Sequence, residues 1–551
     1  MSVRQPASPV ERVAGLVAAI LARERLMLLL LLGLAAVLRL PGLESRGRFE
    51  FDQGQDMLVL RAFVQDGVVP LLGPKTSVGV FHHGALEYFL LAPSAWLSGA
   101  EPLAVMLEFA LIGIAAVAVT WWLGRVIGGP TVGLVAGLLL AVSPAAVDES
   151  TFIWNPNPVP LFAALALGAA WRARQTGLAR WWAIALTATA AVANLHILGA
   201  VFVPPILALL VADVWAARRA HDRAQDAPDR ARVRAALRGA AVGLAAGVVI
   251  YLPLIVSELQ TGFAEARAIG AYLAAGGGEQ GAGLFDRLVV TAFRVVDWPF
   301  VGLVTEVPIA SSLVFAVVVG LLAWLAVAGH ARAGTAGRWI GGLVAWSILA
   351  LAVAAPSLAK VVLGLPNDHY HSFLDPVLVV GVALASVTLA RRAGWGRPAR
   401  VARTVIAATL VGLVGLALWR QPGPDPNGGW PAARAAGGRV VDIVEADSGG
   451  RPASIAVVNL PDFEPATWIS YPIVYAAGAA SPVVGDPTAA AYVVLGCDRL
   501  FEVQLGATCG GPADADWLPR LVGSIAARLE LVERFDLSPR VNVSVYRVAA
   551  R

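Results

Sequence analysis

Residues 103–125 read LAVMLEFALIGIAAVAVTWWLGR, and this stretch decides the class of fold. Apart from Glu108 and the final Arg125 it carries no charge. A helix of about 20 apolar residues is long enough to cross the hydrocarbon core of a bilayer. Similar stretches recur along the chain, whose 551 residues are 58% hydrophobic and only 15% charged. Because soluble domains are about 25% charged, the sequence predicts a polytopic helical membrane protein and excludes a soluble one.

About eleven segments have the length and hydropathy of membrane-spanning helices. They are 27–43, 103–125, 131–147, 158–172, 181–196, 199–217, 236–256, 308–328, 338–355, 374–390 and 402–419. The segment 84–98 is also apolar, but it is short and contains Glu87. We interpret it as an interfacial helix. The alternative is a further span, which would invert the topology of everything that follows.

The placement of arginines predicts the orientation. Alternate loops are rich in arginine, most densely residues 216–238, and cytoplasmic loops carry the excess of basic residues in membrane proteins. We therefore expect residues 1–26 to be cytoplasmic and residues 44–102 to form the first extracytoplasmic loop. The expected location is the plasma membrane, which is the inner membrane of a bacterium. The net charge of +4 is explained by these loops and does not indicate nucleic-acid binding.

The composition changes after the last predicted span. We expect residues 27–420 to form the transmembrane catalytic domain and residues 421–430, QPGPDPNGGW, to form a linker. Residues 431–551 contain no apolar run long enough to span. Their three short strand-like runs, 454–460, 491–497 and 541–546, alternate with helical stretches and predict a small α/β domain. An odd number of spans places this domain outside the cell.

The only two cysteines of the chain, Cys497 and Cys509, lie in this last region. A close pair in an oxidising compartment predicts a disulfide. The alternative is two unrelated thiols.

The first extracytoplasmic loop gathers the candidate catalytic residues. Asp52 and Asp56 stand in FDQGQD, followed by Lys75 and by the adjacent His82 and His83. Charged groups beside a bilayer are costly unless they face water, a partner or a substrate. On a helix, a spacing of four puts both carboxylates on one face, where one can act as general base and the other can position it or hold a cation. The alternative is a pair of acids at the positive end of a helix dipole.

Two later loops add polar groups on the same side. Asn155 and Asn157 alternate with prolines in IWNPNPVPLF, an irregular segment suited to a sugar-contacting wall. The loop before the tenth predicted span contributes Lys360, His369, Tyr370 and His371. Spacing offers no third metal ligand there, so anion binding is favoured, no metal ligands are assigned, and a divalent cation is left open.

Six segments taken together resemble the lipid-dependent membrane glycosyltransferases of the GT-C class. The nearest branch, of family 39 type, contains the protein O-mannosyltransferases and the lipid A aminoarabinose transferase. The segments are FDQGQD (51–56), GPKTSVGVFHHGALEYFLLAP (73–93), IWNPNPVPLF (153–162), NLHILGA (194–200), YLPLIVSELQTGF (251–263) and HYHSFLDP (369–376). The resemblance covers about residues 27–390, and residues 431–551 resemble no family that we can name.

The resemblance implies an extracytoplasmic active site, a polyprenyl-phosphate sugar as donor, and transfer with inversion to a hydroxyl of a glycan, lipid or protein. It implies that Asp52 is the general base. Relatives carry a basic residue after the first histidine, where this chain has His82, His83 and Gly84. The phosphate ligand is therefore open between Lys75, His82 and His83. Asn155 and Asn157 occupy the region where relatives have an aspartate, which leaves a second catalytic acid open.

An alternative function is a transporter or flippase of a lipid-linked saccharide, and another is a non-catalytic scaffold. Transporters place charges near the membrane midplane and often contain repeated halves. Here the charges lie on one side of the predicted bundle and no half is duplicated. The sequence therefore favours an enzyme.

Overall fold

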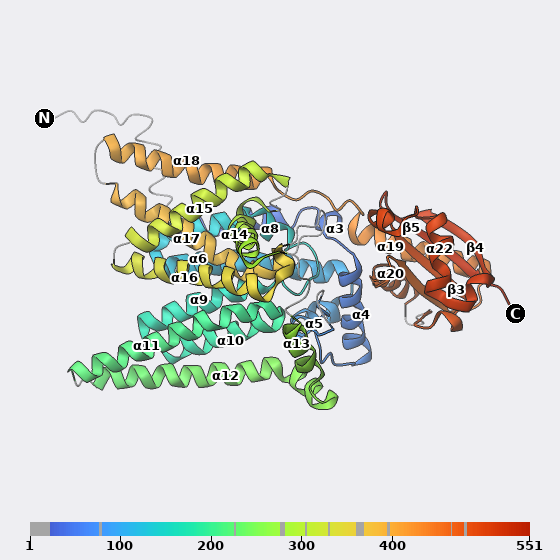
Figure 1. Ribbon diagram of the computed structural model, residues 1–551, viewed down its shortest axis with the longest axis horizontal. Coiled ribbons are helices and arrows are strands. Elements are labelled where there is room, and N and C mark those ends of the chain that lie inside the picture. The colour runs from blue at the N-terminus through green and yellow to red at the C-terminus, as the bar shows by residue number, and fades with distance from the viewer. Residues whose placement is uncertain are drawn as a thin grey trace.

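The chain folds into a bundle of long helices with a small α/β domain at one end (Figure 1). The computed structural model describes residues 23–76, 80–224, 227–275, 282–302, 306–328, 331–359, 368–393, 397–463, 465–478 and 482–550.

Every segment that the sequence predicts to span corresponds to a helix of the bundle. These helices are α2 (Glu24–Arg39), α6 (Pro102–Gly128), α7 (Pro130–Val142), α9 (Val159–Thr176), α10 (Ala179–Leu195), α11 (Val203–Ala224), α12 (Ala227–Thr261), α15 (Pro308–Ala328), α16 (Ala331–Ala354), α17 (Asp375–Arg392) and α18 (Arg397–Trp419). Seven helical segments among the described residues are long and apolar enough to cross a membrane. The multi-pass helical membrane fold is confirmed.

The helices differ in how deeply they lie in the bundle. In α17, 78% of the apolar window is buried, whereas in α18 only 11% is buried. The exposed side of α18 presents Val401, Val405 and Val411, which suits contact with lipid. The core of the bundle is therefore built around α17.

The bundle contains a helix that is not among the predicted spans, α14 (Leu284–Val301). The sequence predicts an extracytoplasmic loop in this region, between the spans 236–256 and 308–328. Four charged residues lower the hydropathy of α14: Asp286, Arg287, Arg294 and Asp297. Two of them are buried, because α14 packs against α15, α16 and α17. Hydropathy alone misses such a helix, since neighbouring helices rather than lipid surround its polar groups.

Shorter helices cover the end of the bundle that faces the α/β domain (Figure 1). They are α3 (Leu43–Arg46), α4 (Phe51–Asp66), α5 (Leu86–Ser98), α8 (Pro144–Asp148), η1 (Ile197–Phe202), α13 (Ala264–Ala274), η3 (Pro356–Ala359) and η4 (Asp368–Leu374). The apolar segment 84–98 forms α5, whose 13 residues extend only about 20 Å. It is too short to cross a core of about 30 Å.

The C-terminal domain is a five-stranded sheet in the order β2-β1-β3-β5-β4. Its strands are β1 (Ile455–Leu460), β2 (Val483–Val484), β3 (Tyr492–Asp498), β4 (Leu529–Asp536) and β5 (Val541–Val548). Its helices are α19 (Gly429–Ser448), α20 (Thr467–Ala477), η5 (Pro487–Ala489), η6 (Arg499–Phe501), α21 (Glu502–Leu505), α22 (Pro512–Val522) and η7 (Gly523–Arg528). β1 pairs in parallel with β2 and β3, and β5 pairs antiparallel with β3 and β4.

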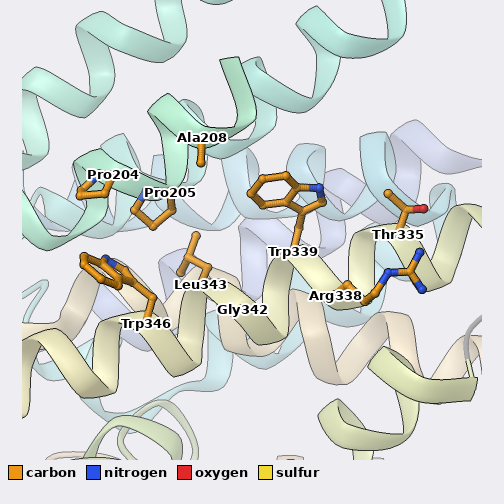
Figure 2. A pocket seen from close by; sticks show the side chains of 9 residues that line it. All are labelled: Pro204, Pro205, Ala208, Thr335, Arg338, Trp339, Gly342, Leu343 and Trp346. Atoms are coloured by element: carbon orange, nitrogen blue, oxygen red, sulfur yellow. The ribbon is translucent and has the colours of Figure 1, made fainter. Parts of the chain in front are cut away.

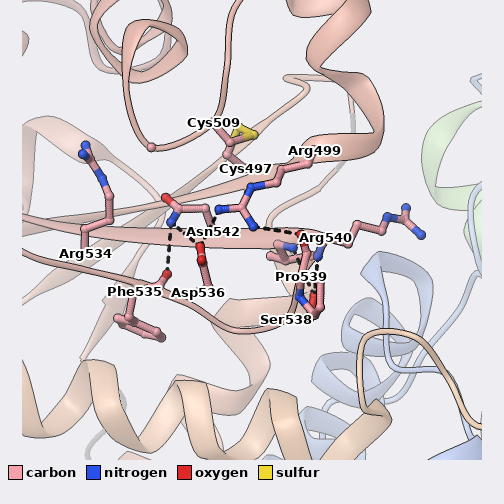
Figure 3. A network of polar contacts seen from close by, with 12 residues as sticks. Cys497, Arg499, Cys509, Arg534, Phe535, Asp536, Ser538, Pro539, Arg540 and Asn542 are labelled. Carbon is pink, nitrogen blue, oxygen red and sulfur yellow. Dashed lines mark hydrogen bonds and ion pairs between the residues drawn. A yellow bond between two sulfur atoms is a disulfide. The ribbon is translucent and has the colours of Figure 1, made fainter.

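Two separate cores hold the domain together. One lies between the sheet and α19 with α20, and the other lies between the sheet and α22. The three predicted strand-like runs are β1, β3 and β5, and the α/β class is confirmed. Cys497, at the end of β3, forms a disulfide with Cys509, next to a network in which Arg499 contacts Asp536 (Figure 3).

Candidate functional site

A cavity of about 220 Å³ lies at the end of the bundle nearest the α/β domain. Segments far apart in the sequence line it: α4, the loop 74–83, the loop 154–155, η1, α13, the end of α16, and η4. We call it the α4 cavity. Its polar lining residues are Asp52, Lys75, Thr76, His83, Trp154, Asn155, His196, Tyr272 and Tyr370.

Asp52 stands in the first turn of α4. A capping box begins this helix, in which the side chain of Gln53 accepts a hydrogen bond from the backbone N–H of Glu50 (2.9 Å). The carboxylate of Asp52 opens into the cavity and accepts a hydrogen bond from Trp154. Although the Asp52 side chain is exposed to the cavity, the protein packed around it partly desolvates the carboxylate and raises its pKa, whereas the Trp154 hydrogen bond lowers it.

Asp56 lies one turn further along α4 but does not line the cavity. It is 1% exposed and accepts a hydrogen bond from the Tyr88 hydroxyl (2.7 Å). Glu87 is fully buried nearby, and neither of its carboxyl oxygens has a hydrogen-bond partner among the described residues. Burial raises the pKa of Asp56 and of Glu87 well above the usual range, and the neighbouring carboxyls raise them further. Both groups therefore take up a proton more readily than an exposed carboxyl does.

The α/β domain holds α4 from the side opposite the bundle. Gly54 packs so closely on α20 that an added Cβ would lie 2.2 Å from the Thr467 carbonyl oxygen. The Thr467 hydroxyl donates to the Phe51 carbonyl, and the guanidinium of Arg540 lies 3.6 Å from Glu50. The glycine within FDQGQD therefore lets the C-terminal domain approach the turn that carries Asp52.

Lys75 stands on a short antiparallel loop. Lys75 and His82 form a β-bridge, and the backbone N–H of His83 donates to the Pro74 carbonyl (2.9 Å). The ammonium group of Lys75 is exposed, lines the α4 cavity and has no ion-pair partner among the described residues. It is thus a cation available to a ligand.

The two adjacent histidines point to different partners. Nδ1 of His82 lies 3.0 Å from Glu265 of α13 and does not line the cavity. His83 does line it, and its Nδ1 accepts a hydrogen bond from the backbone N–H of Ile197 (3.1 Å). Burial, and then the neighbouring His82, lower the pKa of His83 to about 3. His83 is therefore neutral at physiological pH, with its ring proton on Nε2.

Of the two asparagines in the second predicted extracytoplasmic loop, only one lines the cavity. Asn155 lines the cavity and donates to the Leu195 carbonyl (2.5 Å). Asn157 is buried outside the cavity lining, where it donates to the Phe152 carbonyl (2.8 Å) and stabilises the loop.

Of the candidate residues in the loop before α17 that the structure describes, only Tyr370 is seen to line the α4 cavity. Tyr370 lines the cavity beside His196, with ring centroids 5.2 Å apart. His371 is fully buried in the bundle against Trp298. Lys360 and the side chain of His369 lie outside the described residues.

The structure adds residues to which the sequence gave no role in the site. Glu265 and Tyr272 come from α13, whose acidic and aromatic residues carried no recognisable pattern. From the sequence, Glu87 serves only as a reason to interpret the short apolar segment 84–98 as interfacial. Its proximity to Asp56 follows from the packing of α5 on α4. Among the described residues, no group of three or more histidine, cysteine or carboxylate side chains is arranged to hold a metal ion.

Comparison with known proteins gives one family match. The model of the dolichyl-phosphate-mannose-protein mannosyltransferase family matches residues 82–224, which include His82, His83, Trp154 and Asn155. No curated protein matches the chain in sequence.

Solved structures match over nearly the whole chain. ArnT from Cupriavidus metallidurans, bound to undecaprenyl phosphate, is 14% identical with a TM-score of 0.52, and the match covers 94% of this chain and 97% of ArnT. The Archaeoglobus fulgidus oligosaccharyltransferase in the apo form is 12% identical with a TM-score of 0.50, covering 96% and 74%. The arabinofuranosyltransferase AftD from Mycobacteria is 14% identical with a TM-score of 0.50, covering 96% and 41%. The chain therefore has the fold of the GT-C membrane glycosyltransferases, and its residues 82–224 match the protein mannosyltransferase family.

Proposed function

We propose that this protein transfers a sugar from a polyprenyl-phosphate donor to an acceptor hydroxyl on the extracytoplasmic face, with inversion at the anomeric carbon. The observation that carries the proposal is the α4 cavity, which combines the accessible carboxylate of Asp52 with the exposed side chain of Lys75. An inverting transfer needs a base on the acceptor side and a cation near the departing phosphate. The bound undecaprenyl phosphate in the ArnT structure supports the donor class.

In this mechanism Asp52 accepts the proton of the acceptor hydroxyl as its oxygen attacks the anomeric carbon. The bond to the phosphate oxygen breaks, and the negative charge that grows there is stabilised by Lys75, with Nε2–H of His83 as a neutral donor. The pKa values of Asp56 and Glu87 are raised by burial and by neighbouring carboxyls. Protonation of either group limits the negative charge around Asp52 and so helps Asp52 to act as an ionised base.

Two features support an extracytoplasmic α4 cavity. The arginine-rich segments lie at the end of the bundle away from the α/β domain (Figure 1). The domain next to the cavity contains the Cys497–Cys509 disulfide, and disulfides persist mainly in oxidising compartments. Together they favour the proposed orientation.

The test is a transfer assay with purified protein, a panel of labelled polyprenyl-phosphate sugars and a membrane extract as acceptor. Asp52→Asn should lower the transfer rate by about 10²–10⁴-fold, the usual contribution of a general base. Asp66→Asn, at the exposed end of the same helix, is the matched control and should transfer normally.

Near-normal turnover by Asp52→Asn would exclude the assigned base. Binding of the donors by wild type without transfer of label would favour a transporter of lipid-linked saccharides instead.

A further inference from the structure

A second cavity lies along the surface between α11 and α16, and one end of it adjoins the α4 cavity, because Trp346 in its lining donates to the carbonyl of Val201, which lines the α4 cavity (2.9 Å). The second cavity has a volume of about 480 Å³ and is mostly apolar. We call it the α11–α16 groove. Pro204 and Trp346 lie at one end, and Thr335 and Arg338 lie at the other (Figure 2). The groove follows two helices that are apolar enough to span the membrane, so an occupant of its apolar part would be in contact with lipid.

The end of the groove at Thr335 continues into a polar pocket. This arginine pocket, of about 360 Å³, is lined by Arg174 of α9, Asp213 of α11 and Arg232 of α12, and it shares Thr335 with the groove. Arg232 forms an ion pair with Asp213 (3.1 Å). Asp213 is the only carboxylate that the described residues contribute to the lining of the two cavities, so the positive charges of Arg174, Arg232 and Arg338 outnumber it.

The guanidinium of Arg174 lies over two aromatic rings. It lies 5.3 Å from the ring centroid of Trp171 and 5.8 Å from that of Trp339, which also lines the groove. Its Nη1 atom is buried and has no hydrogen-bond partner among the described residues. A buried guanidinium nitrogen without an acceptor costs free energy, so this position suits an anionic ligand.

We propose that the groove and the arginine pocket together bind one anionic phospholipid of the bilayer. The phosphate lies between Arg174 and Arg338, and an acyl chain follows the groove toward Pro204 and Trp346. Guanidinium groups match phosphate geometry, and basic pockets between membrane helices bind anionic lipid headgroups. Arg338 and Ala354 both lie on α16, and Ala354 lines the α4 cavity. About 24 Å of helix separates them, so the phosphate proposed beside Arg338 is not the donor phosphate.

A bound lipid would connect four helices, because the two cavities are lined by residues of α9, α11, α12 and α16. A ligand that binds only the folded protein raises its thermal stability with ligand concentration. The lipid is therefore expected to stabilise the bundle, in a way that does not depend on sugar transfer.

The experiment uses the full-length protein, delipidated in neutral detergent, and titrates phosphatidylglycerol against phosphatidylcholine. Binding is measured by native mass spectrometry and by the shift in Tm. Wild type should bind one phosphatidylglycerol with a rise in Tm, and phosphatidylcholine should bind more weakly. Arg338→Gln should weaken phosphatidylglycerol binding by about tenfold, the scale of one lost charge-assisted hydrogen bond.

Two further variants make the test specific. Gly342 lines the groove and has no atom within 4 Å of an added Cβ, so the backbone there accepts a side chain, and Gly342→Trp should fill the groove and abolish binding. Arg400→Gln removes an exposed arginine of α18 outside the groove and should bind like wild type.

Three outcomes would overturn the proposal. They are equal affinity for the two lipids, unchanged binding by Arg338→Gln and Gly342→Trp, and displacement of phosphatidylglycerol by stoichiometric undecaprenyl phosphate. The last would assign the groove to the donor tail. Because none of these readouts requires transfer, they are independent of the proposed enzymatic activity.

Discussion

The α4 cavity lies at one end of the bundle, whereas the α11–α16 groove runs along its side, and the two are built in different ways. In the α4 cavity, polar groups are fixed by specific hydrogen bonds, as Asn155 is by Leu195 and His83 by Ile197. The groove is mostly apolar, and its charged end is held by helix packing and by rings around Arg174. The comparison shows two ways to build a site. Catalysis at the α4 cavity requires individual side chains held in fixed orientations, whereas binding of a bilayer lipid requires positive charge next to an apolar groove.

Removing the cation of the α4 cavity should have the largest effect of the substitutions considered below. We expect Lys75→Gln to lower kcat/KM for the donor by about 10–100-fold, because a charge-assisted contact to the phosphate is lost. Lys75→Arg keeps the charge and should recover part of this loss. The measurement is initial-rate kinetics with varied donor, with Arg180→Gln at the exposed start of α10 as control. If Lys75→Gln and Arg180→Gln behave alike, the α4 cavity does not bind phosphate through Lys75.

The contact between α4 and the α/β domain should matter next. In Gly54→Ala the new methyl group would meet the backbone of Thr467, and such overpacking typically costs about 1–3 kcal/mol. We expect transfer to fall by about tenfold as α4 and α20 move apart, together with a lower Tm. The matched control is Gly438→Ala on α19, where no atom lies within 4 Å of the added Cβ. Full activity of Gly54→Ala would mean that the C-terminal domain does not position Asp52.

The pH profile tests whether Asp52 works as a base. A base must be unprotonated, so kcat/KM should rise with pH and reach a plateau above the pKa of Asp52. Because desolvation raises this pKa, the acidic limb should lie above the usual value of about 3.9 for aspartate. A profile that stays flat through this acidic range, measured with wild type over a donor series, would contradict the assignment.

The smallest effect is expected for the buried carboxyl of Glu87. Its pKa is raised in the folded state, so the folded protein binds more protons, and stability falls as pH rises between the unfolded and folded pKa values. Glu87→Gln should therefore flatten the dependence of Tm on pH over that window. The comparison is a series of Tm values for wild type and variant from acidic to neutral pH. An equal slope in both proteins would show that Glu87 does not titrate on unfolding.

These expected effects distinguish the α4 cavity from the α11–α16 groove by what each substitution changes. Substitutions around the α4 cavity should change transfer, whereas Arg338→Gln and Gly342→Trp are designed to change lipid binding. A lipid-site variant that lost transfer to the same extent as Lys75→Gln would show that the two sites are coupled.

The sequence by itself determined the helical membrane class and the α/β class of the C-terminal domain. Both follow from local patterns: apolar runs such as 103–125 have the length of a bilayer, and β1, β3 and β5 appear as short apolar runs. The sequence did not predict α14, because its charged residues lower its hydropathy. It also did not predict β4, which is rich in charged residues because it lies at the edge of the sheet. Around the candidate site, the sequence also pointed to Asp52, Lys75, His83, Asn155 and Tyr370, all of which line the α4 cavity.

Only the tertiary structure decided which of the other polar residues share that cavity. Asp56 follows Asp52 by one turn yet is buried against Tyr88, and His82 pairs with Glu265, which is 183 positions away in the chain. Spacing along a helix fixes which face a residue occupies, but it does not fix what packs against that face. The close approach of Thr467 to Gly54 depends in the same way on the docking of two domains. Such long-range contacts arise from the packing of whole elements and leave no local signal in the sequence.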